Sequence, residues 1–369
     1  MLSKIAAFVR REVVLSVSAL AALLSMLLTP PSAVYASYID WNVLMLLFSL
    51  MAVVAGLRRS GLWDAVSSAL LRRASGARSL AVLLVALCFF SAMLVTNDVA
   101  LITFVPLCFA VLGSAGPGCV ISAVVFMTIA ANLGSMSTPI GNPQNLYLYS
   151  AYGLSFGEFE AAILPLAALS AALVLLGCMT IRGKSAVRTS GARPPLDRPR
   201  LALHGILFAL CLLSVLEVLP VWAAFACTAA ACLALDRPAL RQVDHSLLLT
   251  FVFFFILAGN LAASEAVRSF IGARLRGNEL LFGAGVSQLI SNVPAAVLLS
   301  SFTENWKPLL LGVNIGGLGT PVASLASLIS YRLYARSEGA QKGRYMAAFL
   351  LWNALYLAVL LGAALVLFR

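Results

Sequence analysis

Most of this chain consists of apolar runs that are long enough to cross a lipid bilayer as helices. The hydrocarbon core of a bilayer is about 30 Å thick and takes roughly 20 apolar residues in an α-helix. Of the 369 residues, 62% are hydrophobic and 11% are charged, whereas soluble domains average about 45–50% and 25%. We therefore predict an all-α polytopic membrane protein with spans at about 12–29, 41–57, 119–149, 161–181, 201–216, 218–235, 246–262, 309–331 and 345–368.

Two further apolar stretches do not fit a single crossing. Stretch 79–113 would extend about 50 Å as one helix, so it must fold back. Stretch 280–303 is too short for two spans, and its centre is polar and contains proline: Ser287, Gln288, Ser291, Asn292 and Pro294. We predict that both are re-entrant hairpins, which enter and leave the membrane by the same face.

The distribution of basic residues supports two hairpins. The net charge is +11, but Lys and Arg gather between the apolar runs, which indicates topology rather than a nucleic-acid partner. With two hairpins, the N-terminus and the basic segments all lie in the cytoplasm, where such residues are enriched: 58–78, 182–200, 236–245 and 332–344. Segment 263–278 then lies outside as an interfacial amphipathic helix, and the C-terminus is outside as well.

The first apolar run also has features of a secretory signal peptide. Lys4, Arg10 and Arg11 precede it, and Val34-Tyr35-Ala36 could serve as a small-residue cleavage site. Because the run is long for a signal peptide, we expect it to be retained as the first span of a multi-pass protein of the cell membrane. Removal is the alternative.

The two halves of the chain contain the same parts in the same order. Each has a span, an amphipathic stretch, a hairpin and an interrupted helix, and the corresponding spans, 41–57 and 246–262, cross in opposite directions. Inverted repeats with interrupted helices are typical of secondary transporters with a site near the midplane. The predicted organisation is an N-terminal transmembrane helix (1–40), a first repeat (41–181, hairpin 79–113, broken helix 119–149), a cytoplasmic linker (182–200) and a second repeat (201–368, hairpin 280–303, broken helix 309–331).

The candidate binding residues lie where polar groups and helix breakers occur at membrane depth, which is tolerated only toward protein, water or a ligand. Freed carbonyls bind cations and half-helix N-termini attract anions. A single Gly/Pro break is often only a packing kink, but two breaks at matching positions favour a site. The predicted substrate or ion ligands are Thr96, Asn97, Asp98, Gly134, Ser135, Ser137, Thr138, Pro139, Asn142, Asn145, Ser291, Asn292, Asn314, Gly317, Gly319, Thr320 and Ser324.

Asp98 is the acidic residue inside an apolar segment, and an ionisable group there indicates a function. We predict that it couples transport to a proton or cation. The alternative is that Asp98 caps the second helix of its hairpin. The second hairpin has Val293 at the equivalent place, so the two half-sites are not chemically identical.

Metal and cofactor chemistry is not indicated. The chain has seven Cys and two His, without a CxxC pair, so we expect buried, reduced cysteines, no metal site apart from a transient sodium ion at Asn97 or Asn292, and no cofactor. An intramembrane enzyme would need an HExxH motif or paired carboxylates at membrane depth. Neither occurs, so the sequence does not predict an enzyme.

Four motifs carry a resemblance to a known family. The pair 94–107 (LVTNDVALITFVPL) and 131–149 (ANLGSMSTPIGNPQNLYLY), and the pair 287–301 (SQLISNVPAAVLLSS) and 312–331 (GVNIGGLGTPVASLASLISY), resemble the ion transporter superfamily of arsenite permeases, sodium/proton antiporters and divalent-anion:sodium symporters. The resemblance implies two inverted repeats, assembly as a homodimer through a scaffold domain, and an elevator movement of the hairpin-bearing domain.

The hairpin tips refine that resemblance. In the sodium-coupled dicarboxylate branch the tips are Ser-Asn-Thr; here they are Thr96-Asn97-Asp98 and Ser291-Asn292-Val293, closer to the arsenite-permease branch. We therefore predict a secondary active transporter of a small anion or oxyacid, arsenite-like as the leading substrate, coupled to protons or sodium by alternating access. The alternative is a sodium/proton antiporter of the same fold.

Overall fold

The computed structural model describes residues 12–71, 76–183 and 195–367, and every regular element in these ranges is a helix. Within the described ranges, eight helices are long and apolar enough to cross a membrane. The predicted all-α polytopic fold is therefore confirmed. Some basic residues of the topology argument lie outside the described residues, at 1–11, 72–75 and 184–194. They include Lys4 and the basic residues in most of the predicted linker.

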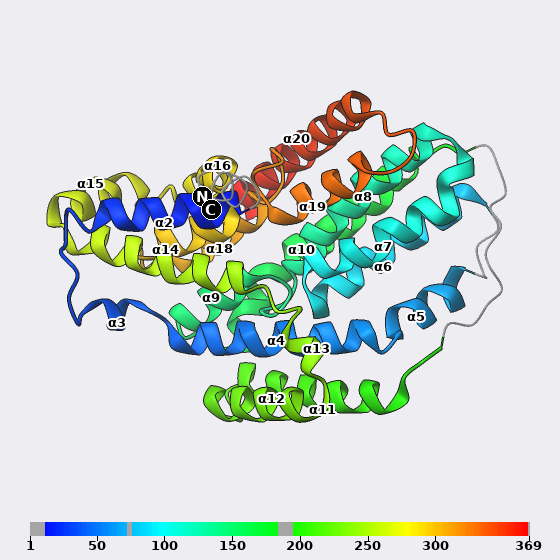
Figure 1. Ribbon diagram of the computed structural model, residues 1–369. Coiled ribbons are helices and arrows are strands. Elements are labelled where there is room, and N and C mark those ends of the chain that lie inside the picture. Colours follow the sequence, from blue (N-terminus) through cyan, green and yellow to red (C-terminus); the bar gives the residue numbers. More distant parts are fainter. Residues whose placement is uncertain (1–11, 72–75, 184–194, 368–369) are drawn as a thin grey trace, which may run out of the picture.

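The same succession of helices occurs twice (Figure 1). After α2 (Val13–Ser25) and α3 (Tyr35–Tyr38), the first half comprises α4 (Trp41–Arg59), α5 (Leu62–Leu71), α6 (Ala77–Val95), α7 (Asn97–Leu112), the short 3₁₀ helix η1 (Gly113–Ala115), α8 (Pro117–Ser135), α9 (Pro143–Ala151) and α10 (Phe156–Cys178). Two helices, α11 (Arg198–Val215) and α12 (Val221–Leu235), and the short α13 (Arg237–Leu240) come between the halves. The second comprises α14 (His245–Ala263), α15 (Glu265–Leu275), α16 (Glu279–Ile290), α17 (Asn292–Ser300), α18 (Trp306–Ile315), α19 (Leu325–Ala335) and α20 (Lys342–Leu367).

The two helical hairpins differ in the lengths of their helices. Helices α6 and α7 have 19 and 16 residues, whereas α16 and α17 have 12 and 9. By length and composition α6 and α7, the latter with η1, can each cross a membrane, and α16 and α17 are too short to do so. In both hairpins the second helix packs along the first. That each hairpin enters and leaves the membrane by one face stays a prediction.

Several predicted spans have different lengths in the structure. The first is helical over Val13–Ser25 only, and the span predicted at 218–235 is the 15-residue α12. The stretches predicted as interrupted helices at 119–149 and 309–331 are each two helices, α8 with α9 and α18 with α19, separated by non-helical residues. These breaks fall where Gly, Pro, Ser and Asn replace apolar residues, because Pro and Gly interrupt the helical hydrogen-bond ladder.

Glycines let the half-helices pack against the hairpins at backbone distance. A Cβ at Gly134 of α8 would lie 2.1 Å from the carbonyl oxygen of Phe89 in α6, and one at Gly316 would lie 2.7 Å from the Cα of Ala284 in α16. Small residues permit such close approach between membrane helices. In both halves, then, a break is held against the first arm of its own hairpin.

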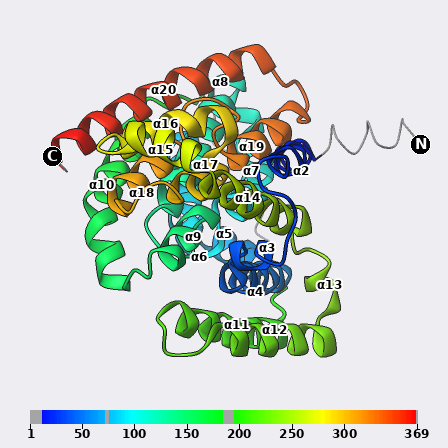
Figure 2. The ribbon, with the colours of Figure 1, turned by 90° about the vertical axis from the view of Figure 1, so that its left-hand side faces the viewer.

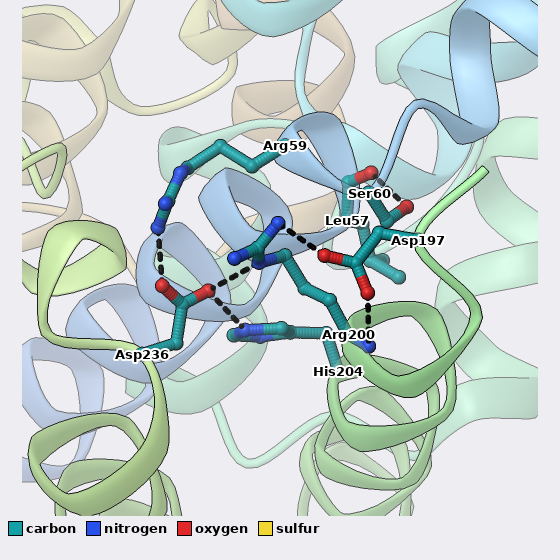
Figure 3. A network of polar contacts seen from close by, with 7 residues as sticks. All are labelled: Leu57, Arg59, Ser60, Asp197, Arg200, His204 and Asp236. Atoms are coloured by element: carbon teal, nitrogen blue, oxygen red, sulfur yellow. Dashed lines mark hydrogen bonds and ion pairs between the residues drawn. The ribbon is translucent and has the colours of Figure 1, made fainter. Parts of the chain in front are cut away.

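Helices α11 and α12 form a layer of their own on α4, visible at the bottom of Figures 1 and 2. The buried carboxylate of Asp236, between α12 and α13, fastens this layer (Figure 3): it accepts hydrogen bonds from Arg59 of α4, from Arg200 Nε at 3.2 Å and from His204 Nε2 at 3.1 Å, the last two on α11. A Cβ at Gly56 would lie 2.1 Å from the His204 ring, so only glycine fits beneath it.

The Asp236 cluster holds a charged carboxylate. Burial raises the pKa of the Asp236 carboxyl, but hydrogen bonds from His204 and Arg59 and the charges of Arg59 and Arg200 outweigh burial, so the pKa lies below its ordinary value. The last turn of α4 is therefore fixed to α11 and α13 at a position next to Arg58.

Candidate functional site

The two hairpin tips have the same unusual backbone. The chain passes from α6 to α7 through Thr96 (φ 76°, ψ 149°) and from α16 to α17 through Ser291 (φ 76°, ψ 154°). Positive φ at a residue other than Gly costs of order 1–3 kcal/mol and persists only where the surroundings enforce it, which is common at ligand sites. The sequence indicated both turns but gave no sign of this conformation.

Each break is tied to its own hairpin by an equivalent hydrogen bond. Thr138 Oγ1 donates to the carbonyl oxygen of Met93 at 2.5 Å, and Thr320 Oγ1 donates to that of Gln288 at 3.2 Å. Each acceptor lies three residues before its tip residue, Thr96 or Ser291. The Thr-Pro motif of each break therefore anchors the first arm of the hairpin.

The two breaks also cross each other, and Asn314 of α18 makes one side of the crossing. Its Oδ1 accepts a hydrogen bond from Asn142 Nδ2 at 3.1 Å, and its Nδ2 donates to Asn145 Oδ1 at 2.6 Å. All three side chains are buried. The second repeat thereby holds the start of α9 in the first.

Asn132 of α8 makes the other side of the crossing. Its Oδ1 accepts a hydrogen bond from Ser324 Oγ at 2.9 Å, and its Nδ2 donates to Ser327 Oγ at 3.5 Å. Ser324 and Ser327 follow Asn314 at the same intervals, ten and thirteen residues, at which Asn142 and Asn145 follow Asn132. The contacts are therefore reciprocal, as expected where two inverted repeats interlock.

Both hairpin tips reach this crossing. Asn97 Nδ2 donates to Asn132 Oδ1 at 2.9 Å, beside the Ser324 hydroxyl. In the second hairpin, the backbone N–H of Asn292 and the side-chain hydroxyl of Ser291 donate to the carbonyl oxygen of Ala323 at 2.9 and 3.3 Å. The second tip thus bonds directly to the second break, and the first tip reaches it through Asn132, so the two tips do not lie on opposite surfaces.

Four carbonyl groups at the breaks accept hydrogen bonds from the side-chain amides of Asn145 and Gln288. Asn145 Nδ2 donates to the carbonyl oxygens of Met136 and Thr138, each at 3.0 Å. Gln288 does the same in the second repeat, donating to Gly316 at 2.8 Å and Leu318 at 2.9 Å. Gln288 was not among the predicted ligands, although its position three residues before the tip was visible in the sequence.

The remaining predicted residues are structural neighbours of the crossing. Gly319 has φ +102°, and a Cβ there would lie 2.3 Å from Gln288 Oε1, while a Cβ at Gly317 would lie 2.8 Å from Asn292 Nδ2. Ser135 Oγ donates to the Asn132 carbonyl. Pro139 and Ser137 are buried in the first break, and the Ser137 hydroxyl has no hydrogen-bond partner among the described residues.

A cavity of about 220 Å³ lies beside the crossing, between α4, the tip of the first hairpin, the start of α9, α19 and the start of α14. Its wall is mostly apolar. The polar residues that line it are Arg58, Thr96, Asp98, Asn142, Gln242 and Asp244. Arg58, Gln242 and Asp244 are exposed, so the cavity opens where α4 ends and α14 begins.

Only some of the predicted ligands line the cavity. Thr96, Asp98 and Asn142 line it, whereas the other predicted ligands lie outside its wall. Arg58 and Asp244 line it too, although both lie in segments predicted as cytoplasmic loops, 58–78 and 236–245. No sequence signal separates Arg58 from its neighbour Arg59, since only the packing of α4 sends the two side chains to different places.

Asp98 faces this cavity with an unsatisfied oxygen. Its Oδ1 is buried and accepts no hydrogen bond from the residues that the structure describes, and its backbone amide donates to Asn97 Oδ1 at 3.0 Å. The N-cap residue of α7 is Thr96, which makes no side-chain capping bond. Asp98 lies in the first turn of α7, where the helix dipole favours a carboxylate, so the structural alternative stays open. The binding roles of the predicted ligands stay predictions.

The chain is similar to known transporters over most of its length. Residues 2–309 match the family described as "Citrate transporter". The inner membrane protein YbiR of Escherichia coli is 34% identical over 331 residues, 88% of each chain, and the uncharacterized transporter MJ0456 of Methanocaldococcus jannaschii is 30% identical over 333 residues, 88% of this chain and 90% of that one. A putative transporter of Dictyostelium discoideum, arsB, is 29% identical over 126 residues, 33% of this chain and 22% of its own.

The fold is shared with a solved transporter. The crystal structure of the Alcanivorax borkumensis YdaH transporter aligns with a TM-score of 0.51 at 16% identity, covering 90% of this chain and 87% of that one. The resemblance to the ion transporter superfamily is thus confirmed. The chain is a polytopic membrane transporter and belongs to the citrate transporter family.

Proposed function

We propose that the protein is a secondary active transporter of a small anion or oxyacid, with an arsenite-like solute as the leading candidate. The observation that carries the proposal is the cavity at the first hairpin tip, where the half-buried Asp98 carboxyl, the Thr96 hydroxyl and the Asn142 amide lie beside two crossed helix breaks. Polar groups at membrane depth cost free energy unless they bind a substrate or form hydrogen bonds with each other.

The reciprocal crossing supports a mechanism of alternating access. Asn132 and Asn314 make matching contacts with the opposite repeat, yet the cavity lies at the tip of the first hairpin. In inverted-repeat transporters, one repeat rocking or sliding against the other opens the site to the opposite face. In the proposed cycle the hairpins and breaks move as an elevator against α4, α11 and α12, and the protein is a homodimer.

The basic segments orient the cavity in the cell membrane. With the N-terminus in the cytoplasm and the C-terminus outside, α4 ends and α14 begins at the cytoplasmic face. The cavity mouth at Arg58, Gln242 and Asp244 therefore opens inward.

Asp98 is the proposed coupling group, and the proton is favoured over sodium. An anion in the cavity lies beside the Asp98 carboxylate, so protonation of Asp98 favours anion binding and anion binding favours protonation. A sodium ion at Asn97 would need its carbonyl oxygen, which accepts the Asp98 amide. The second place proposed for a sodium ion is Asn292, the corresponding residue of the second hairpin.

The test measures flux in proteoliposomes. Arsenite uptake that grows with an inward proton gradient and falls in both Asn97→Ala and Asn292→Ala, at normal expression, supports the proposal. Two carboxylates on the cavity, Asp98 and Asp244, favour a sodium/proton antiporter as the second candidate. Sodium movement driven by pH alone, without oxyacid flux, would establish that candidate instead.

A further inference from the structure

The charges on the cavity wall limit what it can hold. Among the lining residues Arg58 is the one cation, while Asp98 and Asp244 carry carboxyl groups. Asp244 also caps α14, where its Oδ1 accepts a hydrogen bond from the Leu247 amide at 2.9 Å. A multiply charged anion would have one cation to pair with and two carboxylates to face.

We infer that Arg58 is the residue that binds the substrate anion, and that the cavity takes a solute with a single oxyanion head and a small apolar body. This inference rests on the proposed function and narrows its substrate class: among small anions, those with an apolar part are favoured over arsenite, which has none. A guanidinium pairs with one oxyanion through two parallel hydrogen bonds. A second negative charge would lie unpaired near Asp98 and Asp244, and like charges placed close together repel each other.

The apolar wall of the cavity would contact the apolar part of the solute. Leu47, Leu50, Met51 and Val54 line the cavity along α4, and Ile102, Leu146 and Leu325 are among the apolar residues across from them. These side chains offer no hydrogen bonds to further carboxyl or hydroxyl groups. A tricarboxylate such as citrate, the solute in the family's description, would lose its hydration there without replacement.

The position of Arg58 is fixed by its neighbour. Arg59 is held by the buried Asp236, and the close contact of Gly56 with His204 sets the rotation of the same turn of α4. Arg58 is left exposed at the cavity mouth, where an arriving anion can reach it. The guanidinium is therefore presented by the α4, α11 and α12 layer and not by the hairpins.

The test compares anions of equal skeleton and different charge. Labelled 1-propanesulfonate carries one permanent charge, 1,3-propanedisulfonate carries two, and citrate carries up to three. In proteoliposomes we expect saturable uptake of 1-propanesulfonate, and a kcat/KM at least tenfold lower for the other two. Arg58→Gln should lower kcat/KM for 1-propanesulfonate roughly 10- to 100-fold, the loss of a charge-assisted hydrogen-bonded pair, and Arg58→Lys should fall between Arg58→Gln and the unsubstituted protein.

The matched control is Arg241→Gln, which removes an exposed arginine outside the cavity wall and should change nothing. Melting temperature and elution volume show that each variant is folded. Uptake of citrate or the disulfonate equal to that of the monosulfonate, unchanged uptake in Arg58→Gln, or no uptake of any of the three overturns the inference. Arsenite flux that persists in any of these cases leaves the proposed function standing, whereas pH-driven sodium movement without solute flux removes both.

Discussion

The hydrogen bond between Asn314 and Asn145 should stabilise the folded protein by joining the two repeats. The 2.6 Å bond joins Asn314 Nδ2 to Asn145 Oδ1, and both side chains are buried, at 2% and 0% exposed. Asn314→Ala leaves Asn145 Oδ1 without this donor, whereas Asn142 keeps its bond to Ser135. One orphaned buried group costs about 1–3 kcal/mol, although hydrogen bonds between membrane helices average only about 0.6 kcal/mol.

Asn145→Ala should cost more than Asn314→Ala, about 2–4 kcal/mol, because Asn145 also satisfies the carbonyl groups of Met136 and Thr138. The double variant no longer contains the orphaned oxygen. We therefore expect the double variant to be more stable than the sum of the single effects predicts, by about 1 kcal/mol.

The assay is reversible unfolding in mixed detergent micelles, with the free energy of unfolding measured for all four proteins of the cycle. The matched control replaces Asn353, a buried asparagine of α20 whose amide donates to the Phe349 carbonyl. Asn353→Ala combined with Asn145→Ala should be additive. A coupling energy under about 0.3 kcal/mol between Asn314 and Asn145 would refute the claim that the crossing holds the repeats together.

Three further variants test other parts of the structure. Gly134→Ala should lower the melting temperature, since its Cβ would lie 2.1 Å from the Phe89 carbonyl oxygen, whereas Gly285→Ala, with open space around it, should not. The lowered pKa of Asp236 means that its stabilisation is complete above its ordinary value, 3.8, and lost as pH falls through the folded pKa, so Asp236→Asn should flatten the acid limb of a melting-temperature profile. Asp98→Asn should abolish proton movement, followed with an internal pH dye, while solute exchange continues; coupled proton movement in that variant would assign coupling elsewhere.

The breaks and tips were predictable because polar and helix-breaking residues interrupt long apolar runs. The tip expected at 96–98 is the turn at Thr96, and the interruption expected at 137–142 lies between α8 and α9. These are local consequences of composition. Helix lengths were less predictable: the apolar run predicted as a span at 12–29 is helical only over the 13 residues of α2.

Contacts between the repeats were beyond sequence reasoning. Asn314 and Asn145 are 169 positions apart, and nothing local distinguishes their pairing from others. Arg58 and Arg59 are adjacent and chemically identical, yet one lines the cavity and the other binds Asp236. Such differences arise from the rotation of α4 against its neighbours, which the hydrophobic pattern of a helix buried on several sides does not fix.

The asymmetry between the two hairpins constrains the proposed transport cycle. The crossing is reciprocal in position, but the first tip offers Asp98 where the second offers Val293. If the repeats simply exchanged conformations, the cavity that opened at the second tip would contain no carboxylate, and a proton taken up on one face could not be released on the other. The proposed cycle therefore requires the first tip itself to pass from one face to the other, carrying Asp98 past the wall that α4 provides. A bodily movement of the hairpins and crossed breaks against α4, α11 and α12 meets that requirement, and it would keep the buried Asn132 and Asn314 contacts intact throughout the cycle.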